Sequence, residues 1–153
     1  MIRTIHVSKD AGIQFYYDLR YHIWIYVRLT FLDSKGNTIV FSDENDNSKN
    51  FIFDTGAQNT IISKRRAKEC GYNSLPIKDR VYAGGIGGGV LNCQRIEIPD
   101  MIITKDLIVR RPSVLIPEDD GINVNILGQD ILKPYSYYLD AKRQFIFFDL
   151  DNM

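Results

Sequence analysis

The chain has few of the residues that build disulfide frameworks and metal sites. Its 153 residues include two cysteines, Cys70 and Cys93, and two histidines, His6 and His22. So few cysteines argue against a disulfide scaffold, and neither has a histidine close to it in sequence, so a Cys-His nucleophile or a zinc site has little support. We therefore expect no metal, no cofactor and a reducing, cytoplasmic location.

Long apolar runs and an excess of charge of one sign are also missing. No stretch reaches the roughly 18 apolar residues of a membrane span, and residues 1–10 lack the apolar core of a secretory signal. Nineteen basic residues balance nineteen acidic ones, and no basic run is longer than Lys64-Arg65-Arg66. The sequence therefore indicates neither a nucleic-acid partner nor a membrane.

What is present favours one domain, residues 1–153, built mainly of strands. Apolar residues make up 44% of the chain, enough for one sizeable core. Residues 21–32 are rich in β-branched and aromatic side chains, and a turn at 33–37 leads to a second strand at 38–41, which predicts a hairpin. The polar residues 42–50 predict an exposed loop.

Short helices and a closing hairpin are expected further along. Ser63 is a candidate cap for a helix from Lys64 to about Cys70, ended by Gly71. Residues 125–132 predict an apolar strand stopped by glycine and continued as a short helix before a proline. Residues 137–140 and 144–149 predict a final hairpin. The fold class expected is therefore all-β with one or two short helices.

The segment Asp54-Thr55-Gly56-Ala57 carries the clearest chemical signal. It lies between an apolar run, 51–53, and a β-branched run, 60–62, so it predicts one carboxylate at the tip of a tight turn. Metal-free peptide hydrolysis without a covalent intermediate needs an ionised and a protonated carboxyl about 3 Å apart. The chain has a single copy of the motif, so the second carboxylate is expected from a second chain, in a homodimer. The alternative is an ordinary turn.

A glycine-rich segment follows at residues 83–89, in which five of seven residues are glycine. Glycines let a hairpin tip bend and bring its amides against a ligand backbone, which predicts a mobile flap. A phosphate-binding loop is a weaker alternative, because no Gly-Lys-Ser/Thr follows. A flexible turn without function is the third possibility.

These elements, in this order, resemble the retropepsin family, the single-lobed homodimeric aspartic peptidases of retroviruses and their cellular relatives. Residues 84–88 resemble the flap tip of the retroviral enzymes. Residues 54–71, 79–84 and 126–132 are similar to the retropepsin-like domain of the DNA-damage-inducible ubiquitin-shuttle proteins. The resemblance covers about residues 50–148 and leaves 1–20 outside, as an extension or strand. It implies a closed or partly open β-barrel of the acid-protease type, with one lobe in each protomer.

The resemblance also implies a role for each residue of the site. Asp54 would be the catalytic carboxylate, Thr55 would hydrogen-bond across the dimer, and Gly56 would allow the turn and contact substrate. The flap would close over an extended peptide. The residues expected to bind substrate are Ala57, Gln58, Gly84, Gly85, Ile86, Gly87 and Gly88.

Three positions depart from relatives of this kind. Retroviral enzymes commonly have an Asp where this chain has Gln58 and an Arg where it has Gln129, and these form an ion pair. A neutral amide-to-amide contact is expected in its place. Two-lobed relatives usually carry Ser or Thr where this chain has Ala57. Since that hydroxyl favours the ionised carboxylate, we expect activity nearer neutral pH here.

The sequence leaves the dimer interface and the activity open. Residues 2–7 and 145–148 are candidate interface strands, and pairing within their own chain is the alternative. The predicted function is an aspartic endopeptidase. A catalytically weak or inactive dimer that binds extended peptides, or a protease domain of a larger protein, remains possible.

Overall fold

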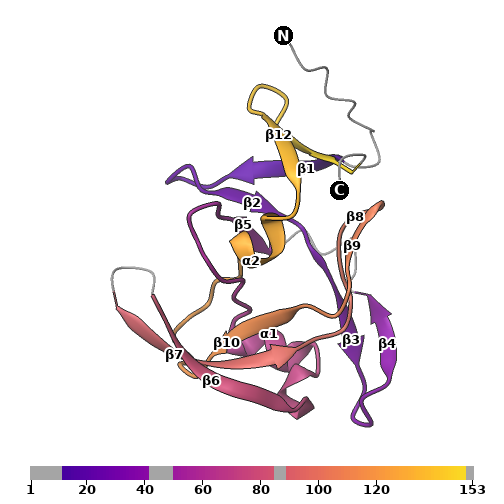
Figure 1. The fold of residues 1–153 in the computed structure, drawn as a ribbon, viewed down its shortest axis with the longest axis vertical. Coiled ribbons are helices and arrows are strands. Elements are labelled where there is room, and N and C mark those ends of the chain that lie inside the picture. Colours follow the sequence, from indigo (N-terminus) through magenta and orange to yellow (C-terminus); the bar gives the residue numbers. More distant parts are fainter. Residues whose placement is uncertain (1–11, 42–49, 85–88, 151–153) are drawn as a thin grey trace.

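The computed structural model describes residues 12–41, 50–84 and 89–150, whose strands belong to three sheets (Figure 1). The six-stranded sheet, in the order β11-β5-β2-β1-β13-β12, contains β1 (Gly12–Tyr17), β2 (Ile23–Ile25), β5 (Phe51–Phe53), β11 (Ile126–Leu127), β12 (Ser136–Asp140) and β13 (Phe145–Asp149). The four-stranded sheet, in the order β4-β3-β8-β9, contains β3 (Arg28–Leu32), β4 (Thr38–Phe41), β8 (Met101–Thr104) and β9 (Leu107–Val109). The three-stranded sheet, in the order β10-β7-β6, contains β6 (Ile77–Gly84), β7 (Val90–Glu97) and β10 (Ser113–Pro117).

The expected all-β class with one or two short helices is confirmed, with two helices, but a closed barrel is not found, because the sheets of the described residues do not close. The segment predicted as one strand, 21–32, divides into β2 and β3, which belong to different sheets. At the division, the buried Asn50 side chain accepts a hydrogen bond from the Val27 amide at 2.8 Å and donates one to the Val27 carbonyl at 2.7 Å. A side chain thus takes the place of a strand partner, and the chain passes from one sheet to the next.

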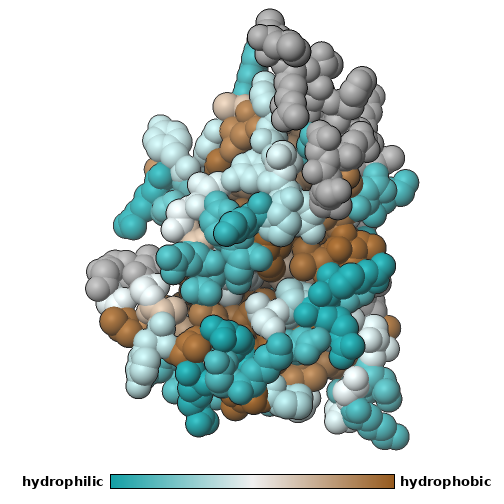
Figure 2. Space-filling model, viewed as in Figure 1, coloured by the Kyte–Doolittle hydropathy of each residue, from teal (hydrophilic) through white to brown (hydrophobic). Residues whose placement is uncertain are grey.

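Two apolar clusters form the core. The larger contains Phe15, Tyr72 and Phe148, which are fully buried, and the Tyr72 hydroxyl donates to the Thr30 carbonyl at 2.8 Å. The smaller cluster comes from strands β5, β6, β7, β10 and β11 and from the loop after β5: Ile52, Ile61, Ala83, Cys93, Leu115 and Ile126. On the face drawn in Figure 2, hydrophilic residues alternate with smaller apolar areas.

The predicted first helix is confirmed as α1 (Lys64–Glu69). The Ser63 hydroxyl accepts a hydrogen bond from the Arg66 amide at 3.1 Å, as a helix cap does. Gly71 then ends the segment with a φ of 82°, before the 3-10 turn η2 (Tyr72–Ser74). A Cβ at Gly71 would lie 2.7 Å from the Leu32 carbonyl oxygen, so both its conformation and its surroundings require glycine.

The predicted closing hairpin is confirmed as β12 and β13, and it decides one question about the dimer. Strand β13 pairs with β1 on one side and with β12 on the other. Residues 145–148 are therefore bonded within their own chain and offer no free edge to a second copy, so this candidate interface strand is wrong. The other candidate, 2–7, lies outside the described residues. In the described part of this sheet, the unpaired edge beside the hairpin is that of β12.

Candidate active site

Asp54 lies directly at the end of a buried strand. The three residues of β5 are all buried, and β5 pairs with β2 on one side and in parallel with β11 on the other. The Asp54 amide donates to the Leu127 carbonyl at 3.1 Å, which continues the β5–β11 pairing up to the carboxylate. The backbone of Asp54 is therefore fixed by the sheet, while its side chain is only half-buried.

The turn after Asp54 holds one of its carboxylate oxygens. The Gly56 amide donates to Asp54 Oδ1 at 2.9 Å, and the Ala57 amide donates to the Asp54 carbonyl at 3.2 Å. Among the described residues, no hydrogen bond reaches Asp54 Oδ2. This leaves one oxygen oriented by the backbone and one available to water or to a second carboxyl group.

A network beneath the turn ties it to α2 (Gln129–Leu132). The buried Thr60 hydroxyl donates to Asp130 Oδ1 at 2.7 Å and accepts from the Gly128 amide at 3.0 Å. Asp130 Oδ2 accepts from the Thr60 amide at 3.0 Å. A Cβ at Gly128 would lie 2.6 Å from the Asn59 carbonyl, so the strand-glycine-helix prediction is confirmed with a steric reason for the glycine. The Thr60–Asp130 pair was not predicted.

The expected contact between the two glutamines is wrong. The Gln129 side chain donates from Nε2 to the Thr55 carbonyl at 2.8 Å. Gln58 contributes its backbone carbonyl, which accepts from the Asp130 amide at 3.0 Å. No hydrogen bond joins the Gln58 and Gln129 side chains in the part of the chain that the structure describes. The catalytic turn is therefore tied to α2 through backbone carbonyls, which the identity of the side chain at position 58 does not affect.

A cleft of about 740 Å³ opens beside Asp54. The apolar part of its lining includes Ile52, Ile61, Ala83 and Ile126 of the smaller core cluster. Gly56, Ala57 and Gln58 line it as well, so these predicted site residues are brought together with Asp54. Thr55 is exposed and does not line this cleft.

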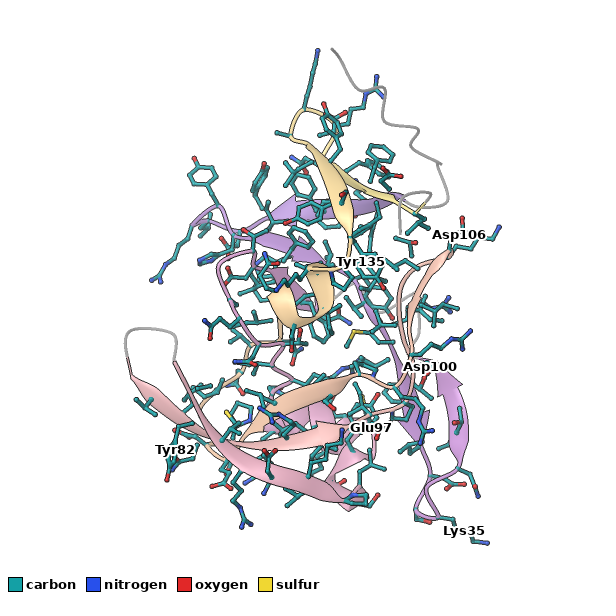
Figure 3. All side chains as sticks on the ribbon, viewed as in Figure 1. Lys35, Tyr82, Glu97, Asp100, Asp106 and Tyr135 are labelled. Carbon is teal, nitrogen blue, oxygen red and sulfur yellow. The ribbon has the colours of Figure 1, made fainter. Side chains whose placement is uncertain are left out.

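The segment predicted as a flap belongs to a hairpin, of which the structure describes the two strands. Strands β6 and β7 form an antiparallel hairpin whose last pair is Gly84 and Val90. Ala83 and Gly84 line the cleft, while Tyr82 is exposed and projects from the hairpin (Figure 3). The predicted tip residues Gly85, Ile86, Gly87 and Gly88 lie outside the described residues.

The wall of the cleft opposite the β6–β7 hairpin carries a charged cluster that was not predicted from the sequence. The turn between β1 and β2 supplies Asp18, Arg20 and His22, and β2 supplies Trp24. Asp18 Oδ1 accepts from the Arg20 and His22 amides at 2.8 and 2.9 Å, and Oδ2 accepts from His22 Nδ1 and Trp24 Nε1 at 2.8 and 2.9 Å. These bonds, the one from Trp24 above all, hold the pKa of Asp18 well below its usual range. The one sequence signal that could have indicated this cluster is the spacing of His22 and Trp24, two residues apart after Asp18, which places both side chains on one face of a strand.

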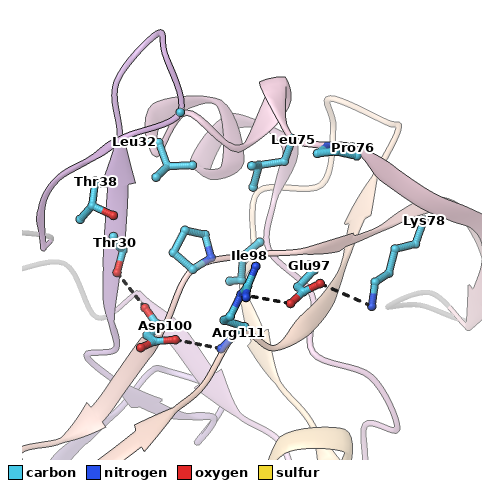
Figure 4. A pocket seen from close by; sticks show the side chains of 12 residues that line it. Thr30, Leu32, Thr38, Leu75, Pro76, Lys78, Glu97, Ile98, Asp100 and Arg111 are labelled. Carbon is cyan, nitrogen blue, oxygen red and sulfur yellow. Dashed lines mark hydrogen bonds and ion pairs between the residues drawn. The ribbon is translucent and has the colours of Figure 1, made fainter.

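A second hollow, of about 630 Å³, lies between β3, the start of β6 and the β7–β8 turn (Figure 4). Its charged side chains are bonded to one another. Glu97 pairs with Arg111 at 3.3 Å and with Lys78 at 4.0 Å. Asp100 accepts from Arg110 at 2.6 Å and from the Arg111 amide at 3.0 Å.

Among the described residues, no three His, Cys, Asp or Glu side chains gather as metal ligands do. No helix in the described ranges is long and apolar enough to cross a membrane. Both cysteines are free and buried, and burial raises the pKa of the Cys70 thiol to about 11. A thiol of this kind is a poor nucleophile.

Comparisons with known proteins agree with this geometry. A family model described as gag-polyprotein putative aspartyl protease matches residues 43–134, more than half of the chain. The chain belongs to this family. The retropepsin-like resemblance found in the sequence is thereby confirmed. A search of curated proteins finds no match.

Two solved structures are similar to this member of the family. A retropepsin-like aspartic protease from Rickettsia conorii is 13% identical, with 97% of this chain and 95% of that chain covered and a TM-score of 0.55. The retroviral protease-like domain of Ddi1 from Leishmania major is 23% identical, with 83% and 89% covered and a TM-score of 0.50. At these identities the likeness shows the fold alone.

Proposed function

We propose that this chain is an aspartic endopeptidase in which two copies of Asp54, one from each protomer of a homodimer, activate water to hydrolyse a peptide bond. One carboxylate would take a proton from water and the other would donate one to the carbonyl oxygen. The observation that supports the proposal most directly is the hydrogen bonding of the Asp54 carboxylate. Its Oδ1 is oriented by the Gly56 amide, and its Oδ2 has no hydrogen-bond partner among the described residues and lies at an open cleft.

Among the described residues, the second carboxylate has one candidate, and that candidate is unsuitable. Asp18 is the only other carboxylate in these residues that lines the cleft. Its two oxygens already accept four hydrogen bonds, and its pKa is lowered, so it stays ionised and cannot hold the shared proton. A second copy of Asp54 is the partner that the chemistry requires.

The remaining site residues take roles that fit their positions. Thr55, exposed beside Asp54, would meet the partner protomer, and Gly56 would contact the substrate backbone. The β6–β7 hairpin would cover an extended peptide, with Gly84 and its neighbours against the peptide backbone. Residues 1–153 would form one retropepsin-like domain. A cytoplasmic location is proposed as well, which two free buried thiols support.

Incubation with a degenerate peptide library near pH 5 to 7 tests the function. The wild-type chain and the Asp54→Asn variant are compared by mass spectrometry of the products, and the mass of the assembly is measured in parallel. Cleavage by the wild type alone, from a dimer, is the expected result. An uncut library with a stable dimer would refute the peptidase and favour a peptide-binding protein.

A further inference from the structure

The wall of the cleft formed by the β1–β2 turn presents nitrogen groups that have no hydrogen-bond partner among the described residues. The Arg20 guanidinium makes no ion pair or hydrogen bond with the described residues, although it lines the cleft. His22 bonds to Asp18 through Nδ1, and no described residue bonds to its Nε2. The His22 side chain is 50% exposed, so Nε2 is open to a ligand.

Asp18 determines what this wall offers to a ligand. Because four donors occupy its two oxygens, Asp18 is already hydrogen-bonded within the wall and is not the group that would bind a ligand there. Asp18 also orients the imidazole ring of His22, because its bond to Nδ1 leaves Nε2 as the ring nitrogen that can bond to a ligand. With Nδ1–H donating to a carboxylate, Nε2 accepts a hydrogen bond when the ring is neutral and donates one when the ring is protonated.

Among the described residues, the charged and titratable groups that line the cleft are Asp18, Arg20, His22 and Asp54. Asp54 lies at the proposed reaction centre, and Asp18 bonds to His22. The charge on the β1–β2 wall that has no ion-pair partner among the described residues is therefore that of the Arg20 guanidinium. A guanidinium is suited to bind a carboxylate, and a protonated imidazole can donate a further hydrogen bond to it.

We propose that Arg20 and His22 form a specificity subsite that binds an acidic side chain of the peptide substrate. This inference rests on the proposed function, and it names the class of residue that the site selects. In a homodimer the two-fold axis gives two such subsites, one for each half of an extended peptide. An acidic residue is therefore favoured on both sides of the scissile bond.

The chain contains one tryptophan, Trp24, and it lies in this wall with its indole N–H bonded to Asp18. Its fluorescence therefore reports locally on an occupant of the subsite. The experiment uses the full chain with Asp54→Asn and three tryptophan-free peptide pools, which carry Glu, Gln or Lys at one fixed position among neutral residues. Fluorescence polarisation of the labelled pools gives the affinity, and Trp24 emission gives the location.

We expect the Glu pool to bind about tenfold or more tightly than the Lys pool at pH 5. Arg20→Glu should reverse this order. His22→Gln should weaken the preference. Lys35→Glu, the same charge change at the distant β3–β4 turn (Figure 3), should leave the preference unchanged.

Equal binding of the three pools, or a preference that survives Arg20→Glu, would overturn the subsite. The proposed function is tested separately, by cleavage of the same pools with the wild-type chain. Cleavage without a preference for Glu would support the peptidase and refute the subsite. Binding that prefers Glu and responds to Arg20→Glu, without cleavage, would establish the subsite and refute the peptidase. Binding to no pool would remove the subsite.

Discussion

The cleft at Asp54 and the second hollow have similar volumes, about 740 and 630 Å³, and both contain acidic and basic side chains. They differ in how those groups are satisfied. In the second hollow Glu97 and Asp100 are bonded to Arg110, Arg111 and Lys78. In the cleft at Asp54, one carboxylate oxygen, one imidazole nitrogen and one guanidinium have no partner among the described residues. Unsatisfied polar groups, rather than volume, therefore distinguish the site that can act on a ligand.

The largest effect expected from this comparison is on catalysis. Asp54→Asn should reduce kcat by about 10⁴-fold, because an amide can neither take a proton from water nor share one with a second carboxyl group. Asp100→Asn makes the same chemical change in the second hollow, and the activity per folded molecule should remain within about twofold of wild type. Steady-state cleavage of one fluorogenic peptide measures both variants. Equal losses in the two variants would contradict the distinction between the hollows.

Removing the threonine hydroxyl beneath the catalytic turn should destabilise the protein more than removing the one beside the second hollow. Thr60→Val removes a part-buried bond to Asp130 and a buried bond from the Gly128 amide, and should lower the free energy of unfolding by about 2–3 kcal/mol. Thr30→Val removes one bond, to the Asp100 carbonyl, and should cost about 1 kcal/mol. Urea denaturation at a fixed protein concentration measures the difference. A larger cost at Thr30 would show that the catalytic turn does not depend on the Thr60 network.

The two glutamines near the catalytic turn provide a smaller test. Gln129→Met removes the bond to the Thr55 carbonyl and should cost about 0.5–1 kcal/mol, with a loss of kcat. Gln58→Asp should change stability by less than about 0.5 kcal/mol, because the exposed Gln58 contributes only its backbone carbonyl to the turn. Thermal unfolding of the two variants measures the contrast. A large loss in Gln58→Asp alone would mean that its side chain supports the site after all.

The smallest effect expected is a shift of the pH profile. Ala57→Ser places a hydroxyl donor beside the carboxylates, which favours their ionised form and moves the acid limb of kcat/KM to lower pH by roughly half a unit. The wild-type profile should have its maximum nearer neutral pH. A wild-type maximum below about pH 4 would contradict this role for Ala57.

Local patterns in the sequence predicted the elements that place Asp54. The Ser63 cap bonds to the Arg66 amide three residues further on, and Gly71 has the positive φ that favours glycine at a helix end. The Asp54 turn follows from a buried strand that ends in Asp-Thr-Gly. These features depend on residues a few positions apart, whereas the steric need for glycine at 71 and 128 comes from Leu32 and Asn59, which are distant in sequence.

The parts that were missed depend on residues distant in sequence. The division of segment 21–32 into two strands requires Asn50, and the Thr60–Asp130 pair joins positions 70 residues apart. That the sheets of the described residues do not close into a barrel has the same origin, since sheet closure is decided by how distant strands pair. Asp18 and His22 resemble an ordinary polar turn until the fold places them opposite the β6–β7 hairpin, across the cleft at Asp54.

The central claim is that each chain supplies half of one catalytic site, and subunit mixing tests it most directly. Wild-type protein at a fixed concentration is equilibrated with increasing amounts of Asp54→Asn protein, and the cleavage rate is measured with substrate in excess. We expect the rate to fall toward zero as mixed dimers with a single Asp54 carboxylate replace wild-type dimers. A rate that stays at the wild-type value while mixed dimers form would contradict the shared site.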